Sequence, residues 1–173
     1  ISKAKNLFTL RNIPDTDKLK AYVDKMRPQS AVIVGGGFIG LEMAENLHEL
    51  GIKTRLVEVS KQVMEALDFE MAAILQEHLR EKGVELFLNN GLSRIEAEGK
   101  KIVLRNGEEL YADMIIMAAG VQPESKLAED AGLELGNRKS IRVNKYLQTS
   151  DPSIYAVGDA IEVKDYISGK NCF

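Results

Sequence analysis

Three glycines between residues 35 and 40 form the stretch whose spacing most clearly indicates chemistry. In "GGGFIG", Gly35, Gly37 and Gly40 follow the G-x-G-x-x-G spacing of loops that bind a dinucleotide pyrophosphate. The first glycine would form a sharp turn, the second would let the main chain approach the pyrophosphate, and the third would allow close helix packing. Taken alone, the spacing is a weak signal, because glycine-rich turns are common.

An acidic residue follows at the distance where such loops have a ribose acceptor. Glu58 lies 18 residues after Gly40, near the roughly 20 residues expected for that carboxylate. A carboxylate accepts hydrogen bonds from ribose hydroxyls and repels a 2′-phosphate, so Glu58 predicts NADH rather than NADPH. Lys61 weakens this inference, because its ammonium could reach a phosphate. The alternative interpretation is a structural turn followed by a surface glutamate.

The residues around the glycines alternate between strand-like and helix-like patterns. Short runs of β-branched residues predict buried strands, and apolar residues at helical spacing predict helices that end at Gly51 and Gly83. The expected order is a strand at 30–36, a helix at 38–50, a strand at 53–60, a helix at 68–82 with Asp68 as N-cap, and a strand at 84–88. Such alternation predicts a parallel sheet with right-handed crossovers.

The pattern changes after residue 88. Turn signals at Glu98–Lys100 and at Asn106-Gly107 predict three antiparallel strands. The chain then has a predicted parallel strand at 113–120, a short helix at 123–132, and short strands near 141–143 and 154–157. The predicted fold is α/β, a Rossmann-like parallel sheet with an inserted three-stranded antiparallel meander.

Composition excludes several functional classes. The chain has 173 residues, a net charge of −3 and no apolar run near the roughly 18 residues of a membrane span, so we expect neither nucleic acid nor membrane as a partner. Residues 1–30 carry a local excess of +4; a solvated helix face at 15–26 explains it, and a docking surface is the alternative. The single cysteine, Cys172, excludes an internal disulfide, and we expect no metal site and a cytoplasmic location.

The order of elements, with a meander before "IIMAAGVQP", resembles the NAD(P)H-binding domain of the FAD-dependent pyridine nucleotide–disulfide oxidoreductases. The resemblance covers nearly the whole chain. "NLFTLRNIPDTDKLKAYV" and "AVGDAIEVKDYISGK" are most similar to the branch of coenzyme A-disulfide reductase, NADH oxidase and NADH peroxidase. The resemblance implies a connecting segment at 1–28, an NAD(P)H-binding domain at 29–144, and the start of the second half of an FAD-binding domain at 145–173.

The resemblance also implies roles for residues near the nicotinamide. Phe38 matches an aromatic gate over the nicotinamide pocket, with Ile39 beside it in the loop, and Glu42 matches a glutamate beside the flavin and nicotinamide. Ala119 and Gly120 would end a strand above the cofactor crevice. The alternatives are a packing residue at 38, a helix-surface acid at 42 favoured by the helix dipole, and a plain strand-to-helix turn.

A second cofactor motif lies near the end of the chain. "TSDPSIYAVGDA" resembles the family's second FAD motif, in which the residue matching Asp159, after Gly158, binds the ribityl and pyrophosphate portion of FAD. Without the resemblance, the stretch predicts only a strand followed by a turn.

Residues 1–173 lack other parts that the family has. The first FAD motif, the redox cysteine and the dimerisation domain are absent, and Cys172 is not at the redox position. We therefore expect a fragment of a homodimeric flavoenzyme that positions NADH for hydride transfer to FAD and is inactive alone, with no catalytic residue of its own. The final acceptor, whether a coenzyme A disulfide, oxygen, a peroxide or another small molecule, stays open. A stand-alone NAD-sensing module and a self-sufficient dehydrogenase are the alternatives, and the latter lacks a convincing proton-transfer residue.

Overall fold

The computed structural model describes residues 4–172. The chain divides into two compact units, one ending at Gly120 and the other beginning at Val121. The first unit contains the glycine loop, and the second contains the "VGDA" stretch.

A five-stranded parallel sheet forms the centre of the first unit. Its strand order is β1-β8-β2-β3-β4, and every neighbouring pair is parallel. The strands are β1 (Leu7–Thr9), β8 (Met114–Met117), β2 (Ser30–Val34), β3 (Lys53–Val57) and β4 (Glu85–Phe87). In the central strand β2, all residues after the first are buried, as expected for a parallel strand covered on both faces.

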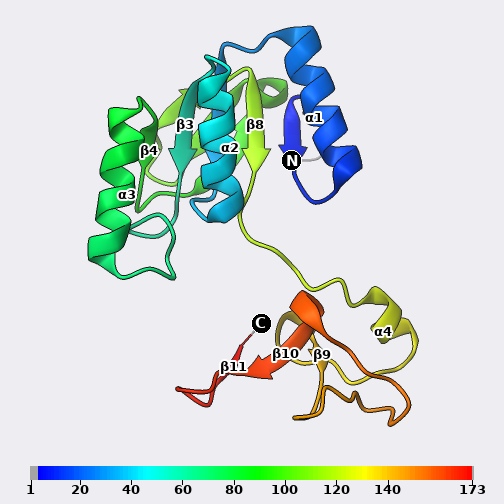
Figure 1. The fold of residues 1–173 in the computed structure, drawn as a ribbon. Helices are drawn as coiled ribbons and strands as arrows, with labels where there is room; N and C mark the ends of the chain where they lie inside the picture. Colours follow the sequence, from blue (N-terminus) through cyan, green and yellow to red (C-terminus); the bar gives the residue numbers. More distant parts are fainter. Residues whose placement is uncertain (1–3, 173) are drawn as a thin grey trace. The chain divides into compact units, whose positions relative to one another are not determined.

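Three helices cover one face of this sheet (Figure 1). They are α1 (Ile13–Met26), α2 (Phe38–Glu49) and α3 (Phe69–Glu81). Ile33 and Leu56 of the sheet pack in one core with Leu47 of α2 and Leu79 of α3. The apolar spacing that predicts the two later helices is therefore the spacing that buries one stripe of each.

The antiparallel meander covers the opposite face. Its strands are β5 (Leu92–Glu96), β6 (Lys101–Leu104) and β7 (Glu109–Tyr111), in the order β5-β6-β7, with a short 3₁₀ turn (Ala97–Gly99) after β5. Val32 and Val34 pack with Ile102 and Leu104 of β6. Because side chains alternate along a strand, β2 contributes to both cores, and the unit has three layers. The predicted fold class is confirmed.

Two polar networks join elements that are distant in sequence. The Asp113 carboxylate, just before β8, accepts hydrogen bonds from the main-chain N–H groups of Gln29 (2.9 Å) and Ser30 (3.0 Å). Partial burial, together with the Asp113 charge, raises the pKa of Tyr22. In the edge strand β4, Glu85 pairs with Lys53 (2.7 Å) and Arg55 (3.0 Å) of the neighbouring strand β3. The hydrogen bond from Lys53 is the main cause of the lowered pKa of Glu85.

The second unit has a small sheet and little apolar core. Its elements are α4 (Lys126–Asp130), β9 (Ile141–Arg142), β10 (Ile161–Lys164) and β11 (Asn171–Cys172), with 3₁₀ turns at Asn137–Lys139 and Gly158–Ala160. β10 lies between β9, which is parallel to it, and β11, which is antiparallel. Among the described residues of this unit, Ala128 and Ile161 are the only buried apolar side chains.

The structure differs from the sequence prediction in three places. Residues 7–9 form β1, inside the segment expected to be a connection, and they pair with β8. β10 and β11 were not predicted. The prediction of a strand near 154–157 was wrong, since within this segment only Tyr155 forms a β-pair with another residue, in an isolated bridge to Gln148. In the described part of the chain no neighbouring strand pairs with this segment, and a strand requires such a partner.

Candidate functional site

The glycine loop lies at one edge of the parallel sheet, where the carboxyl ends of several strands meet. Gly35 donates its N–H to the carbonyl of Val57 at the end of β3 (2.8 Å), and Ala118 donates to the carbonyl of Val34 at the end of β2 (2.8 Å). From β2 the chain continues to β3 and β4 on one side, whereas β8 lies on the other. This is a topological switch point, where open α/β sheets bind their ligands.

The three motif glycines have different surroundings. Gly35 has a φ of +117°, and a Cβ there would collide with the Ala118 carbonyl oxygen. A Cβ on Gly40 would collide with the carbonyl of Gly35, so only glycine lets α2 begin this close to the strand. A Cβ on Gly37, in contrast, would have no described atom within 4 Å. The side of the loop at Gly37 is therefore open to a ligand.

The start of α2 is suited to an anion. Gly37 is the N-cap residue, and within the described chain no side chain caps this helix end. Its first turn, "FIGL", contains no acidic residue. The first main-chain N–H groups of the helix consequently have no side-chain acceptor, and the helix dipole places partial positive charge there. Such an end can hold a phosphate group.

Glu58 follows β3 directly and contacts the glycine loop. Its Oε2 accepts a hydrogen bond from the Gly36 N–H at 2.6 Å, and its Oε1 accepts one from the Ser60 N–H at 2.7 Å. Each carboxylate oxygen has a second lone pair, so both can accept further hydrogen bonds from ribose hydroxyls. The structure thus brings Glu58 and the glycine loop together, as the spacing predicts.

Gly36 is a residue of the candidate site that the sequence prediction did not include. A Cβ on this buried glycine would lie 3.2 Å from both Cγ and Oε2 of Glu58, and 3.2 Å from Cγ1 of Val63. The motif treats position 36 as variable. The glycine triplet was a visible signal, but only the fold shows that Glu58 occupies the space beside it.

Lys61 lies in the loop that follows Glu58. Its Nζ is 5.8 Å from the centroid of the Phe69 ring at the start of α3, within range of a cation–π contact. The loop itself is anchored, because the Val63 N–H donates to Oε1 of the buried Gln76 at 3.1 Å. Lys61 therefore has an aromatic partner on α3, a contact that the sequence prediction did not consider.

The remaining predicted residues of the first unit surround the same edge. Phe38 begins α2 with 73% of its surface exposed, Ile39 packs partly against the core, and Glu42 is exposed. Ala119 and Gly120 follow β8 and are also exposed. Phe38 is therefore accessible to a ligand.

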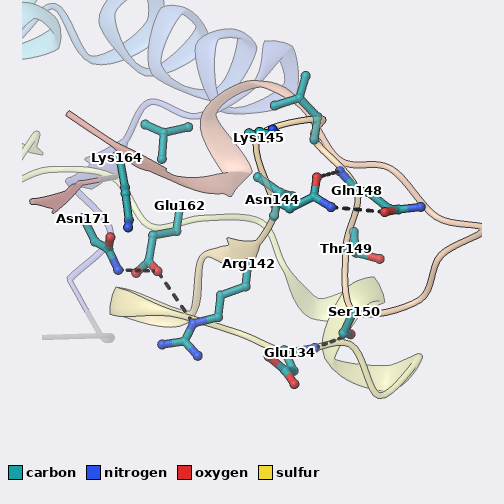
Figure 2. Close-up of a pocket in the computed structure, with 13 residues that line it drawn as sticks. Glu134, Arg142, Asn144, Lys145, Gln148, Thr149, Ser150, Glu162, Lys164 and Asn171 are labelled. Carbon is teal, nitrogen blue, oxygen red and sulfur yellow. Dashed lines mark hydrogen bonds and ion pairs between the residues drawn. The ribbon is translucent and has the colours of Figure 1, made fainter. Parts of the chain in front are cut away.

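The predicted FAD-contacting residues, Gly158 and Asp159, lie in the second unit. Both are exposed in the 3₁₀ turn before β10. The same unit has a hollow of about 730 Å³ that the sequence did not predict (Figure 2). Glu162 lines it, with 8% of its surface exposed, and its carboxylate accepts hydrogen bonds from the Asn137 N–H (2.7 Å) and from Asn171 Nδ2 (3.0 Å). Arg142 is 3.7 Å from the same carboxylate.

None of the helices within residues 4–172 combines the length and apolar character needed to cross a membrane. Across the same residues, the acidic, histidine and cysteine side chains do not form a cluster that could hold a metal ion.

Comparison with known proteins places the chain in a family. The profile of the family described as pyridine nucleotide-disulphide oxidoreductase matches residues 2–169. An NADH oxidase of Methanocaldococcus jannaschii is 39% identical over 166 residues, which is 95% of this chain and 37% of that protein. The chain therefore spans a little over a third of the length of this relative.

Two crystal structures are similar over almost the entire chain. Reduced CoADR-RHD of Bacillus anthracis is 53% identical, with a TM-score of 0.94 over 98% of this chain and 30% of its own. An FAD-dependent pyridine nucleotide-disulphide oxidoreductase of Desulfovibrio vulgaris is 35% identical, with a TM-score of 0.85 over 99% of this chain and 44% of its own. The predicted family resemblance and the predicted cofactor classes, a pyridine nucleotide and FAD, are confirmed. The chain belongs to the pyridine nucleotide-disulphide oxidoreductase family.

Proposed function

We propose that this chain is the NADH-binding domain of a flavin-dependent NAD(P)H oxidoreductase that acts on a disulfide, oxygen or a peroxide. Within that enzyme it would hold NADH in position for hydride transfer to FAD. The observation that carries the proposal is the open side of the glycine loop at Gly37, next to the uncapped start of α2 and one strand away from Glu58.

Each part of the site has a role in binding. The pyrophosphate would lie against Gly37 and the first N–H groups of α2, where no side chain of the described residues competes with it. The adenosine ribose would donate hydrogen bonds to Glu58. When both cofactors are bound, NADH supplies a hydride and FAD accepts it. The chain itself contributes orientation, with Phe38 covering the nicotinamide, Glu42 beside it, and Ala119 forming part of the crevice wall.

The electrostatics of the site favour NADH over NADPH. Two like charges about 4 Å apart repel by about 1 kcal/mol in water and about 4 kcal/mol near a protein surface, and Glu58 would face a 2′-phosphate at such a distance. Lys61 is the one cation in this loop that could offset the repulsion, and it lies against the Phe69 ring instead. We expect the preference for NADH to be clear but not absolute.

The second unit supports the fragment interpretation. Its apolar side chains are mostly exposed, including Leu127, Tyr146, Tyr155, Val157 and Tyr166. We propose that residues 145–173 begin the second half of an FAD-binding domain, with Gly158 and Asp159 contacting FAD, and that the rest of the flavoenzyme covers these side chains. The complete flavoenzyme would be a cytoplasmic homodimer, and the rest of its sequence would supply the first FAD motif and the redox cysteine. The fragment alone would therefore be inactive.

A stand-alone NAD-sensing module without catalysis is the second candidate. It is favoured by one observation: the glycine loop, Glu58 and α2 all lie in a first unit that has its own two cores. Such a module would bind NADH tightly and change conformation as a monomer, which analytical ultracentrifugation with and without NADH would detect.

Titration calorimetry of the chain with NADH, NADPH and FAD tests the proposal. We expect weak binding of NADH, weaker binding of NADPH and almost none of FAD. An absence of heat with NADH, or FAD that stays bound through a desalting column, would contradict the assignment.

A further inference from the structure

The carboxylate of Glu58 joins two loops that are distant in sequence. Oε2 accepts the Gly36 N–H from the glycine loop (2.6 Å), and Oε1 accepts the Ser60 N–H from the loop after β3 (2.7 Å). Both hydrogen bonds have an ionised acceptor, and such bonds are about twice as strong as neutral ones. Glu58 is thus bound on both oxygens to the protein's own main chain before any ligand arrives.

The position of residue 36 is determined from three sides. Its N–H is held by Glu58, its carbonyl accepts the Met64 N–H at 2.8 Å, and its missing side chain leaves the space that Glu58 and Val63 occupy. The next residue, Gly37, has open space around it. Because Gly36 is held in this way, the position of the Gly37 peptide group at the open side of the loop, where a ligand would lie, is also fixed.

We propose that Glu58 is a positioning residue for the pyrophosphate loop in addition to being the ribose acceptor. This inference rests on the proposed function, since it concerns the same NADH site. If Glu58 acted on ribose alone, its loss would weaken only ligands that carry the adenosine ribose. If it also positions the loop, its loss weakens ligands that carry a phosphate and no adenosine.

The test compares NADH with reduced nicotinamide mononucleotide, which has a phosphate and no adenosine. Glu58→Gln keeps the shape but offers one acceptor oxygen and one NH₂ donor, so one of the two main-chain N–H groups loses its acceptor. Glu65→Gln is the matched control, because Glu65 is an exposed acid of the same loop and its substitution changes the net charge equally. Affinities are measured by NMR titration.

We expect E58Q to weaken the mononucleotide by about tenfold, the scale of one lost hydrogen bond to a charged group, and E65Q to leave it within about twofold. Unchanged mononucleotide affinity in E58Q, with NADH affinity reduced, would overturn the positioning role. If E58Q does not fold, Glu58→Asp is used, since it keeps the charge but is one methylene too short to contact both N–H groups.

A second readout needs no ligand. In the wild-type chain the Gly36 amide should exchange with solvent at least about tenfold more slowly than in Glu58→Ala, which removes both acceptor oxygens. Equal exchange rates would also overturn the proposal. Failure of the proposed function would look different, since the wild type would then bind neither nucleotide while the Gly36 amide stayed protected.

Discussion

Substituting aspartate for Gly37 should make the protein more stable and its NADH binding weaker. Gly37 has φ −83° and ψ −172°, the extended geometry of an N-cap residue, which any amino acid can adopt. Aspartate is a better N-cap than glycine by a few tenths of a kcal/mol, and its charge at the helix start adds about 0.3–1 kcal/mol. For a chain of this size the sum corresponds to a rise in Tm of about 1–4 °C.

The same carboxylate would face the pyrophosphate. A like charge about 4 Å away costs at least about 1 kcal/mol even in water, which is about a fivefold weaker Kd, and screening in high salt should reduce the difference. Gly37→Ser is the control, because serine caps the helix comparably without a charge. The assays are thermal unfolding by circular dichroism and NADH titration calorimetry at low and high salt. A variant that is stabilised yet binds NADH as the wild type does would refute the placement of the pyrophosphate.

Three further perturbations have defined outcomes. Gly35→Ala forces a side chain into a left-handed backbone position and against the Ala118 carbonyl, so it should cost at least about 2 kcal/mol and lower the Tm in a thermal melt. Phe69→Ala removes the aromatic partner of Lys61, so the Lys61 ammonium can offset the repulsion of a 2′-phosphate by Glu58. The ratio of the NADPH Kd to the NADH Kd should therefore fall about two- to fivefold, as measured by competition titration. Glu85 has a lowered pKa in the folded state, so its stabilising contribution is complete at neutral pH and is lost as the pH falls below its ordinary value of 4.5. The Tm difference between wild type and Glu85→Gln should therefore shrink in acid, and a constant difference would show that the ion pair is not its source.

Local patterns predict the elements that surround the glycine loop well, because their signals lie within a few residues of one another. The β-branched run at 30–34 and the apolar spacing in α2 and α3 are of this kind. β1 was missed because three residues carry no periodicity, and its strand state depends on pairing with β8. The opposite error occurred at 154–157, where a strand-like pattern has no neighbouring strand among the described residues.

The candidate site shows the same limit at the level of single residues. Spacing alone predicts Glu58 as a ribose acceptor, because the length of one helix and one strand fixes its distance from the loop. Its hydrogen bond to Gly36 and the contact between Lys61 and Phe69 depend on how the two loops fold over the sheet edge. No spacing rule contains that information.

The two adjacent glycines in the middle of the loop meet opposite physical requirements. At residue 36 the protein's own carboxylate fills the space that a side chain would need, and it takes up the N–H. At residue 37 the space is open and the helix start is uncapped. A negative group is therefore already bound on one side of the loop, and an anionic ligand fits only on the other. Because Glu58 contacts the loop and is also the predicted ribose acceptor, the charge that holds the loop is also the charge that would select against a 2′-phosphate. Loop geometry and cofactor choice should therefore change together when that carboxylate is altered.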